Sequence, residues 1–209
     1  MRVLVSTCLL LTLLPPAASL DCLQCLTPQC DKTTSFLCDG EDSANEDKVC
    51  FSKVMDFPLN GSNRLETKYI SLGCIRRQDC HPATYSASLE HSGYIYTQVQ
   101  CCDTNLCNLP ISVEDLTNYE FNEMQCPGCF AGWPTGKHLC SAQGTVNCRG
   151  HENRCIEFTG RFNTPLYFYP TISFRGCATE SMCALATGDP EAATDLLKPV
   201  KANARCSPA

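Results

Sequence analysis

The stretch Gly73-Cys74-Ile75-Arg76-Arg77-Gln78-Asp79-Cys80 has a counterpart later in the chain, Gly176-Cys177-Ala178-Thr179-Glu180-Ser181-Met182-Cys183, with the same glycine and the same cysteine spacing. The repeat extends to other cysteines, because four more recur 104 or 105 residues later: Cys22, Cys25, Cys50 and Cys101 correspond to Cys126, Cys129, Cys155 and Cys206. Seven residues separate Cys30 from Cys38, and seven separate Cys140 from Cys148. Self-similarity of this kind identifies two homologous modules.

The first nineteen residues have the features of a signal peptide. Arg2 precedes an apolar run from Val3 to Leu14, and the small residues Ala17-Ala18-Ser19 follow two prolines. The run is shorter than the ~20 residues that a membrane-spanning helix needs, so we expect cleavage after Ser19 and a secreted, extracellular protein. The chain stops at Ala209 without the hydrophobic tail of a lipid-anchored protein, which predicts no membrane anchor. The predicted division is signal peptide 1–19, first module 20–108, linker 109–125 and second module 126–209.

The cysteine content predicts a disulfide scaffold. Of nineteen cysteines, Cys8 leaves with the signal peptide, and the remaining eighteen can all pair. The competing interpretation is zinc, because Cys22-x2-Cys25 and Cys126-x2-Cys129 look like halves of zinc ribbons. A ribbon needs a second close pair or a histidine pair for each site, and the chain offers neither, so we expect no metal and no cofactor.

Between the cysteines the pattern is that of β-strands. Polar and apolar residues alternate from Val49 to Phe57, and 94–99 is rich in aromatic and β-branched residues. Residues 154–158 and 171–174 repeat this pattern in the second module, and no long helical period stands out after the signal peptide. Each module is too small to depend on a hydrophobic core alone, so covalent bridges must hold it. The prediction is an all-β protein of two disulfide-rich domains in tandem.

The end of the first module, Cys101-Cys102-Asp103-Thr104-Asn105-Leu106-Cys107-Asn108, resembles the CC-x4-CN ending of the lymphocyte-antigen-six/urokinase-receptor family. The resemblance covers the whole module and implies three β-rich fingers that extend from a disulfide knot, a snake-toxin-like fold. The second module lacks the last cysteine pair and the closing asparagine, so the resemblance does not extend to its final turn. The resemblance also implies the disulfide pairing: Cys22–Cys50, Cys25–Cys30, Cys38–Cys74, Cys80–Cys101, Cys102–Cys107, Cys126–Cys155, Cys129–Cys140, Cys148–Cys177 and Cys183–Cys206.

The repeated glycine-cysteine stretches and the two-module architecture are similar to those of the gamma-type phospholipase A2 inhibitors. This resemblance implies a non-catalytic protein that binds and inhibits a secreted phospholipase A2. The alternative is a receptor-like binder of another extracellular protein, such as a protease, a complement component or a cell-surface receptor, because one fold hosts many partners.

Two features of the predicted fingers bear on binding. Asn60-Gly61-Ser62 is an N-glycosylation sequon near the middle of the first module's second finger, where a glycan would hinder contact. The corresponding finger of the second module carries a cluster of apolar and aromatic residues that we predict to contact the partner. Packing within the protein is the competing role of these residues, which are Phe162, Leu166, Tyr167, Phe168 and Tyr169.

Charge and motifs argue against two other classes of function. Residues 20–125 carry 7 basic and 16 acidic side chains, which disfavours nucleic acid and anionic membranes, whereas residues 126–209 carry 8 basic and 6 acidic. No catalytic constellation is present: His81, His91, His138 and His151 fall in no nucleophile or metal motif, and we predict no enzyme. The acidic residues between Asp39 and Asp47 do not match a calcium-loop spacing.

Overall fold

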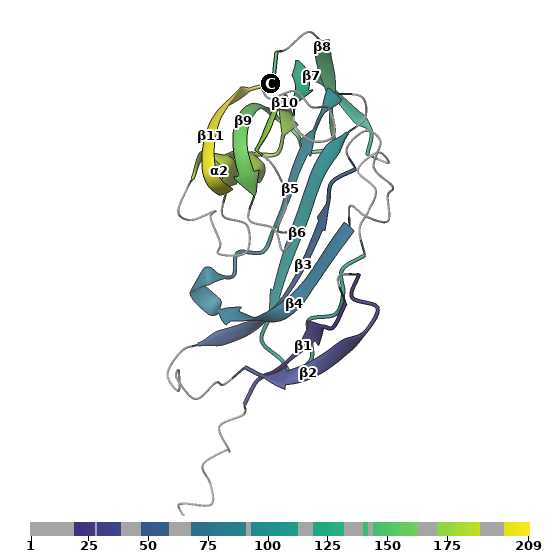
Figure 1. Cartoon of the computed structure of the whole chain (residues 1–209), viewed down its shortest axis with the longest axis vertical. Helices are drawn as coiled ribbons and strands as arrows, with labels where there is room; N and C mark the ends of the chain where they lie inside the picture. Colours follow the sequence, from purple (N-terminus) through teal and green to yellow (C-terminus); the bar gives the residue numbers. More distant parts are fainter. Residues whose placement is uncertain are drawn as a thin grey trace, which may run out of the picture.

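The computed structural model describes residues 19–27, 29–38, 47–58, 68–90, 93–112, 119–131, 140–141, 144–162, 171–188 and 199–209. These residues form β-strands with two short helical segments, and the long axis of the molecule follows β5, β6 and β3 (Figure 1). The β1–β2 hairpin lies at one end and β7 and β8 lie at the other (Figure 1).

The described residues of the first module form strands β1 to β6 and the 3₁₀ turn η2. β1 and β2 form a separate antiparallel hairpin, and the other four strands pair in the order β5-β6-β3-β4. The bounds are β1 Asp21–Cys25, β2 Thr33–Leu37, β3 Lys48–Asp56, β4 Lys68–Arg76, η2 Arg77–Asp79, β5 Ala83–Ser88 and β6 Tyr94–Cys102.

The second module repeats this order with one replacement. Its third finger contains a helix, α2, where the first module has β5. The bounds are β7 Phe121–Ala131, β8 Gly144–Arg149, β9 Arg154–Phe162, β10 Ile172–Ala178, α2 Glu180–Thr187 and β11 Pro199–Pro208. β10 pairs with β9 and β7, and β11 pairs with β9, all antiparallel.

Local sequence explains why α2 is a helix. The Thr179 side chain caps the first turn by accepting a hydrogen bond from the Met182 N–H, and Glu180 places a negative charge near the helix N-terminus. Gly188 ends the helix in the left-handed conformation (φ 81°), which glycine adopts without steric cost. The helix buries Met182 and Leu185, each of which contributes about 1.5–3 kcal/mol by burial.

One sheet runs through both modules. β10 of the second module pairs with β5 of the first, with Cys177 opposite Ser88 and Ala178 opposite Ala87. The continuous strand order is therefore β11-β9-β10-β5-β6-β3-β4. This pairing covers the edge of β5, which would otherwise present unpaired backbone groups to solvent.

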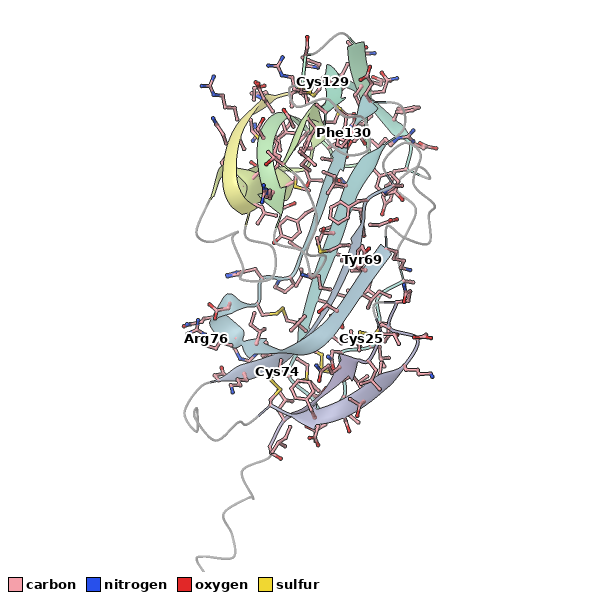
Figure 2. All side chains as sticks on the ribbon, viewed as in Figure 1. Cys25, Tyr69, Cys74, Arg76, Cys129 and Phe130 are labelled. Carbon is pink, nitrogen blue, oxygen red and sulfur yellow. A yellow bond between two sulfur atoms is a disulfide. The ribbon has the colours of Figure 1, made fainter. Side chains whose placement is uncertain are left out.

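The largest hydrophobic core is also shared by the modules. β3, β5 and β6 contribute alternate residues from one face, and β9, β10 and α2 cover them with Phe158, Phe174, Met182 and Leu185. The rings of Phe158 and Phe174 stack with their centroids 5.1 Å apart. Figure 2 shows Tyr69 on β4 and Phe130 on β7, two partly buried residues that pack against this core from opposite modules. Neither module buries this surface alone.

Nine disulfides hold the fold, each within one module. The first module has Cys22–Cys50, Cys25–Cys30, Cys38–Cys74, Cys80–Cys101 and Cys102–Cys107, and the second has Cys126–Cys155, Cys129–Cys140, Cys148–Cys177 and Cys183–Cys206. These are the pairs that the family resemblance implies. In a small extracellular domain each such bridge contributes about 2–5 kcal/mol.

Two regions to which the sequence assigned no structure contain strands. β7 begins at Phe121, so residues 121–125 of the predicted linker are strand, paired with β8 from Phe121 opposite Arg149 to Gln125 opposite Asn147. The end of the second module, which lacks the CC-x4-CN turn, continues as β11 to Pro208, opposite Arg154. The missing turn is replaced by further strand pairing.

Candidate functional site

The junction between the modules is fixed by hydrogen bonds around Thr179. The backbone N–H of Thr179 donates to the Ser86 carbonyl oxygen at 3.0 Å, and its hydroxyl accepts from the Ser86 N–H at 3.2 Å. The Ser181 hydroxyl donates to the Thr84 carbonyl oxygen at 2.5 Å. The start of α2 is thus attached to the backbone of β5, and this attachment continues the β5–β10 pairing.

A buried carboxyl lies on the opposite face of β5. Glu152, in the turn between β8 and β9, is 0% exposed, and its two oxygens accept from the Ser86 hydroxyl at 3.2 Å and from the Arg149 N–H at 3.0 Å. Burial raises the pKa of Glu152, and the hydrogen bonds from Arg149, Ser88 and Ser86 oppose this only in part. The second module therefore contacts both faces of the first module's edge strand.

A lysine is buried in the middle of the first module's sheet. Lys53 lies between Phe51 and Met55 on β3, on the face that forms the shared core, and is 6% exposed. Burial lowers its pKa to about 8, because the charged ammonium loses hydration.

The closing asparagine of the first module ties three strands together. The Asn108 amide nitrogen donates to the carbonyl oxygens of Leu23 (3.0 Å), Phe51 (3.0 Å) and Gly73 (3.4 Å), and its oxygen accepts from the Leu23 N–H at 2.9 Å. These residues belong to β1, β3 and β4. One buried amide thus anchors the fingers at their base.

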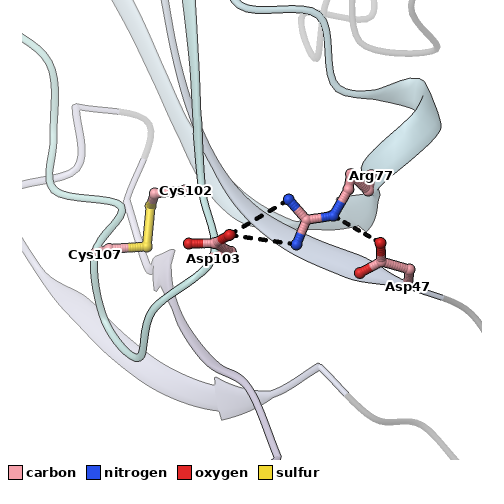
Figure 3. Close-up of polar contacts among 5 residues, drawn as sticks. All are labelled: Asp47, Arg77, Cys102, Asp103 and Cys107. Carbon is pink, nitrogen blue, oxygen red and sulfur yellow. Dashed lines mark hydrogen bonds and ion pairs between the residues drawn. A yellow bond between two sulfur atoms is a disulfide. The ribbon is translucent and has the colours of Figure 1, made fainter.

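A second contact at this base is electrostatic. Figure 3 shows Arg77 of η2 between two carboxylates: its Nε lies 2.7 Å from Asp47, and a terminal nitrogen lies 3.4 Å from Asp103, which follows Cys102. The hydrogen bond with Asp47 raises the pKa of Arg77. All three side chains are exposed, so this group orients loops and adds little to stability.

Both modules match one known family. The sequence model described as the u-PAR/Ly-6 domain matches the chain twice, over residues 18–110 and 122–207. The chain belongs to the u-PAR/Ly-6 domain family.

Individual relatives within the u-PAR/Ly-6 family differ in what their names describe. Phospholipase A2 inhibitor NAI of Notechis ater is 31% identical over 100% of this chain and 97% of its own length. A gamma-type phospholipase A2 inhibitor of Gloydius brevicaudus siniticus is 29% identical over 85% of this chain and 83% of its own length. The urokinase plasminogen activator surface receptor of Bos taurus is 37% identical over 44% of this chain and 27% of its own length.

The residues predicted to bind a partner fall mostly outside the described part of this u-PAR/Ly-6 protein. Asn60 lies outside it, as do Leu166, Tyr167, Phe168 and Tyr169. The backbone of Phe162 ends β9, opposite Pro199. Of the histidines, His81 is half-buried after η2 and His151 is exposed in the β8–β9 turn, while His91 and His138 lie outside the described residues. The predicted contact cluster and the glycan therefore stay predictions.

Two groups of cysteine sulfurs lie within 4.8 Å of one another: Cys22, Cys38 and Cys50, and Cys126, Cys148 and Cys177. Each of these sulfurs is bonded in a disulfide, so it offers no thiolate to a metal. The proximity reflects the packing of two bridges at the base of each module, where Cys22 Sγ lies 3.0 Å from Cys38 Sγ.

None of the helices in the described residues has the length and apolar character of a membrane-spanning segment.

The sequence did not identify the junction residues as a unit. Glu152 follows no motif, and Ser86 and Thr179 are separated by ninety-three positions. Gly176 was visible as half of the repeated glycine-cysteine pair. A signal for α2 was also present, since a threonine precedes a run of good helix formers that ends at Gly188.

Proposed function

We propose that this protein is a secreted, non-catalytic inhibitor that binds a phospholipase A2. The likeness to phospholipase A2 inhibitor NAI, which extends over the whole chain, carries the proposal. The scaffold supports it, because the disulfides brace each module internally, and the shared core and the pairing of β5 with β10 join the two modules. A rigid scaffold binds a partner without losing much conformational entropy.

The proposed mechanism is steric. The protein covers the surface through which the enzyme reaches lipid, and substrate entry stops. The finger residues Phe162, Leu166, Tyr167, Phe168 and Tyr169 are the proposed contact, and the proposed glycan at Asn60 belongs to the other module. In this arrangement replacement of Tyr167 and Phe168 by serine weakens binding of the enzyme, measured by calorimetry on a variant that retains its thermal unfolding transition.

A direct test measures hydrolysis by a panel of secreted phospholipases A2 at increasing molar ratios of the purified protein. We expect inhibition that saturates at a fixed stoichiometry, and no inhibition after reduction and alkylation of the disulfides. The enzyme and lipid concentrations are varied in parallel, because the amount of protein needed for full inhibition scales with the enzyme if the protein binds the enzyme and with the lipid surface if it coats lipid. A panel without any inhibited enzyme would exclude the proposal.

The second candidate is a receptor-like binder of another extracellular protein. The likeness to the urokinase plasminogen activator surface receptor over 95 residues favours it. Capture of partners from extracellular fluid on the immobilised protein distinguishes the candidates: recovery of a protease or receptor without any phospholipase supports the second.

A further inference from the structure

The outer face of the second module carries a row of charged residues across three strands. In the register of the sheet, Glu157 on β9 lies directly opposite Arg175 on β10 and directly opposite Arg205 on β11. Side chains that face each other across antiparallel strands stand about 4.5–5.5 Å apart at Cβ. Ile156 and Phe158, the neighbours of Glu157, are buried in the shared core, so the row points away from it.

An open hollow of about 600 Å³ surrounds this row. Besides the three charged residues, its lining includes Gln125 and Pro127 of β7 and Pro208 of β11. The hollow therefore combines charged groups with apolar walls, which reduce the competition of water for a bound ion.

Some N–H groups of the two guanidinium groups in the hollow form no hydrogen bond with a described residue. Arg175 donates one terminal N–H to Glu157 at 2.6 Å, while its Nε is buried without a hydrogen-bond partner among the described residues. Arg205 is exposed and forms no ion pair with any residue that the structure describes. The Arg175 side chain is nevertheless 35% exposed, so its terminal nitrogens are the groups that a second carboxylate can reach.

We propose that this hollow is a binding site for a carboxylate on the surface of a protein partner, an aspartate or glutamate side chain held between Arg205 and Arg175. A planar guanidinium presents paired N–H groups that match the two oxygens of a carboxylate. Glu157 holds Arg175 in place through an ion pair of 2.6 Å and leaves the exposed Arg205 as the second guanidinium that a carboxylate can contact. The second module as a whole carries 8 basic and 6 acidic residues, so it attracts acidic surfaces.

The first test rests on the proposed function and uses a phospholipase A2 that the protein inhibits. Arg205→Glu weakens binding about tenfold, because it replaces an attractive ion pair by a repulsive one. Glu157→Gln has the opposite effect on affinity: it tightens binding severalfold, since it removes the carboxylate that competes for Arg175. A merely structural role of the row would weaken binding in both variants.

Lys32→Glu is the matched control. It makes the same change in net charge on an exposed residue of the β1–β2 hairpin, at the other end of the molecule (Figure 1), and we expect its affinity to change less than twofold. Equal losses in Arg205→Glu and Lys32→Glu would show general charge attraction and overturn the site.

A second test does not depend on the phospholipase. Side-chain Nε–H signals of Arg175 and Arg205 are followed by NMR during titration with sodium succinate, sodium phosphate or sodium chloride at constant ionic strength. We expect both signals to shift with succinate at millimolar concentration in the wild type, and the Arg175 signal to stay in place in Arg205→Glu. Shifts that are equal for succinate and chloride overturn the proposal, and a preference for phosphate replaces the carboxylate by another anion. If no phospholipase is inhibited but succinate binds, the proposed function fails and the site stands.

Discussion

Gly176 of β10 lies so close to Ser88 of β5 that a Cβ atom built on the glycine would stand 2.0 Å from the Ser88 carbonyl oxygen. Both residues are at the junction, where Cys177, the neighbour of Gly176, pairs with Ser88. The contact is with backbone, which cannot rotate away as a side chain can. Only glycine lets the two modules approach this closely.

The first prediction follows from this contact. Gly176→Ala destabilises the protein by about 3 kcal/mol or more, because β10 must move away from β5 and open the shared core. Equilibrium unfolding in guanidinium chloride with disulfides intact measures the loss. Gly93→Ala is the control: its Cβ would meet nothing closer than 3.4 Å, so we expect a change below about 1 kcal/mol. Similar unfolding midpoints for the two variants would contradict the close approach.

Gly176 also shows which structural features the sequence could predict and which it could not. The repeat placed Gly176 and Gly73 at equivalent positions, but they have different neighbours: a Cβ on Gly73 would meet the Phe51 ring at 2.8 Å. Cysteine spacing is a local property of each module and predicted two modules correctly. The pairing of Ser88 with Cys177 joins strands of different modules, and no spacing within one module encodes it.

The second prediction concerns the base of the first module. Asn108→Ala removes a buried amide and leaves the backbone groups of Leu23 and Phe51 without their partner, which costs about 3 kcal/mol. Hydrogen exchange should show faster exchange at β1 than at the junction strand β5, because the lost bonds hold β1 against β3 and β4. Asn105→Ala, which removes one exposed acceptor of the Asp21 N–H, serves as the comparison and loses less. Uniform acceleration along the chain would argue against a local anchor.

The third prediction concerns Lys53. Its pKa falls from 10.5 in the unfolded chain to about 8 in the fold, so between these values the unfolded state binds more protons and stability rises with pH. Below pH 8 both states are protonated and the fold carries the full cost of the buried charge, about 3 kcal/mol. Lys53→Met removes that cost, so we expect it to unfold at higher denaturant concentration at pH 7. Its stability should also lack the rise above pH 8.

Lys32→Met is the control for the loss of one positive charge, because Lys32 is exposed. We expect this variant to keep the rise in stability above pH 8. A Lys53→Met protein that is less stable than the wild type at pH 7 would mean that the contacts of the ammonium group outweigh its burial.

The last prediction concerns the carboxyl at the junction. The pKa of Glu152 is raised above its ordinary value of 4.5, so the folded state favours the protonated form. Its contribution to stability is therefore fully present below pH 4.5 and is lost as the pH rises through the folded pKa. Glu152→Gln cannot titrate, so the stability difference between wild type and variant should fall as the pH rises from 4.5. Ser86→Ala extends the fall to higher pH, because it removes a donor to the charged form. A constant stability difference across this pH range would show that the protonation of Glu152 does not affect the stability of the fold.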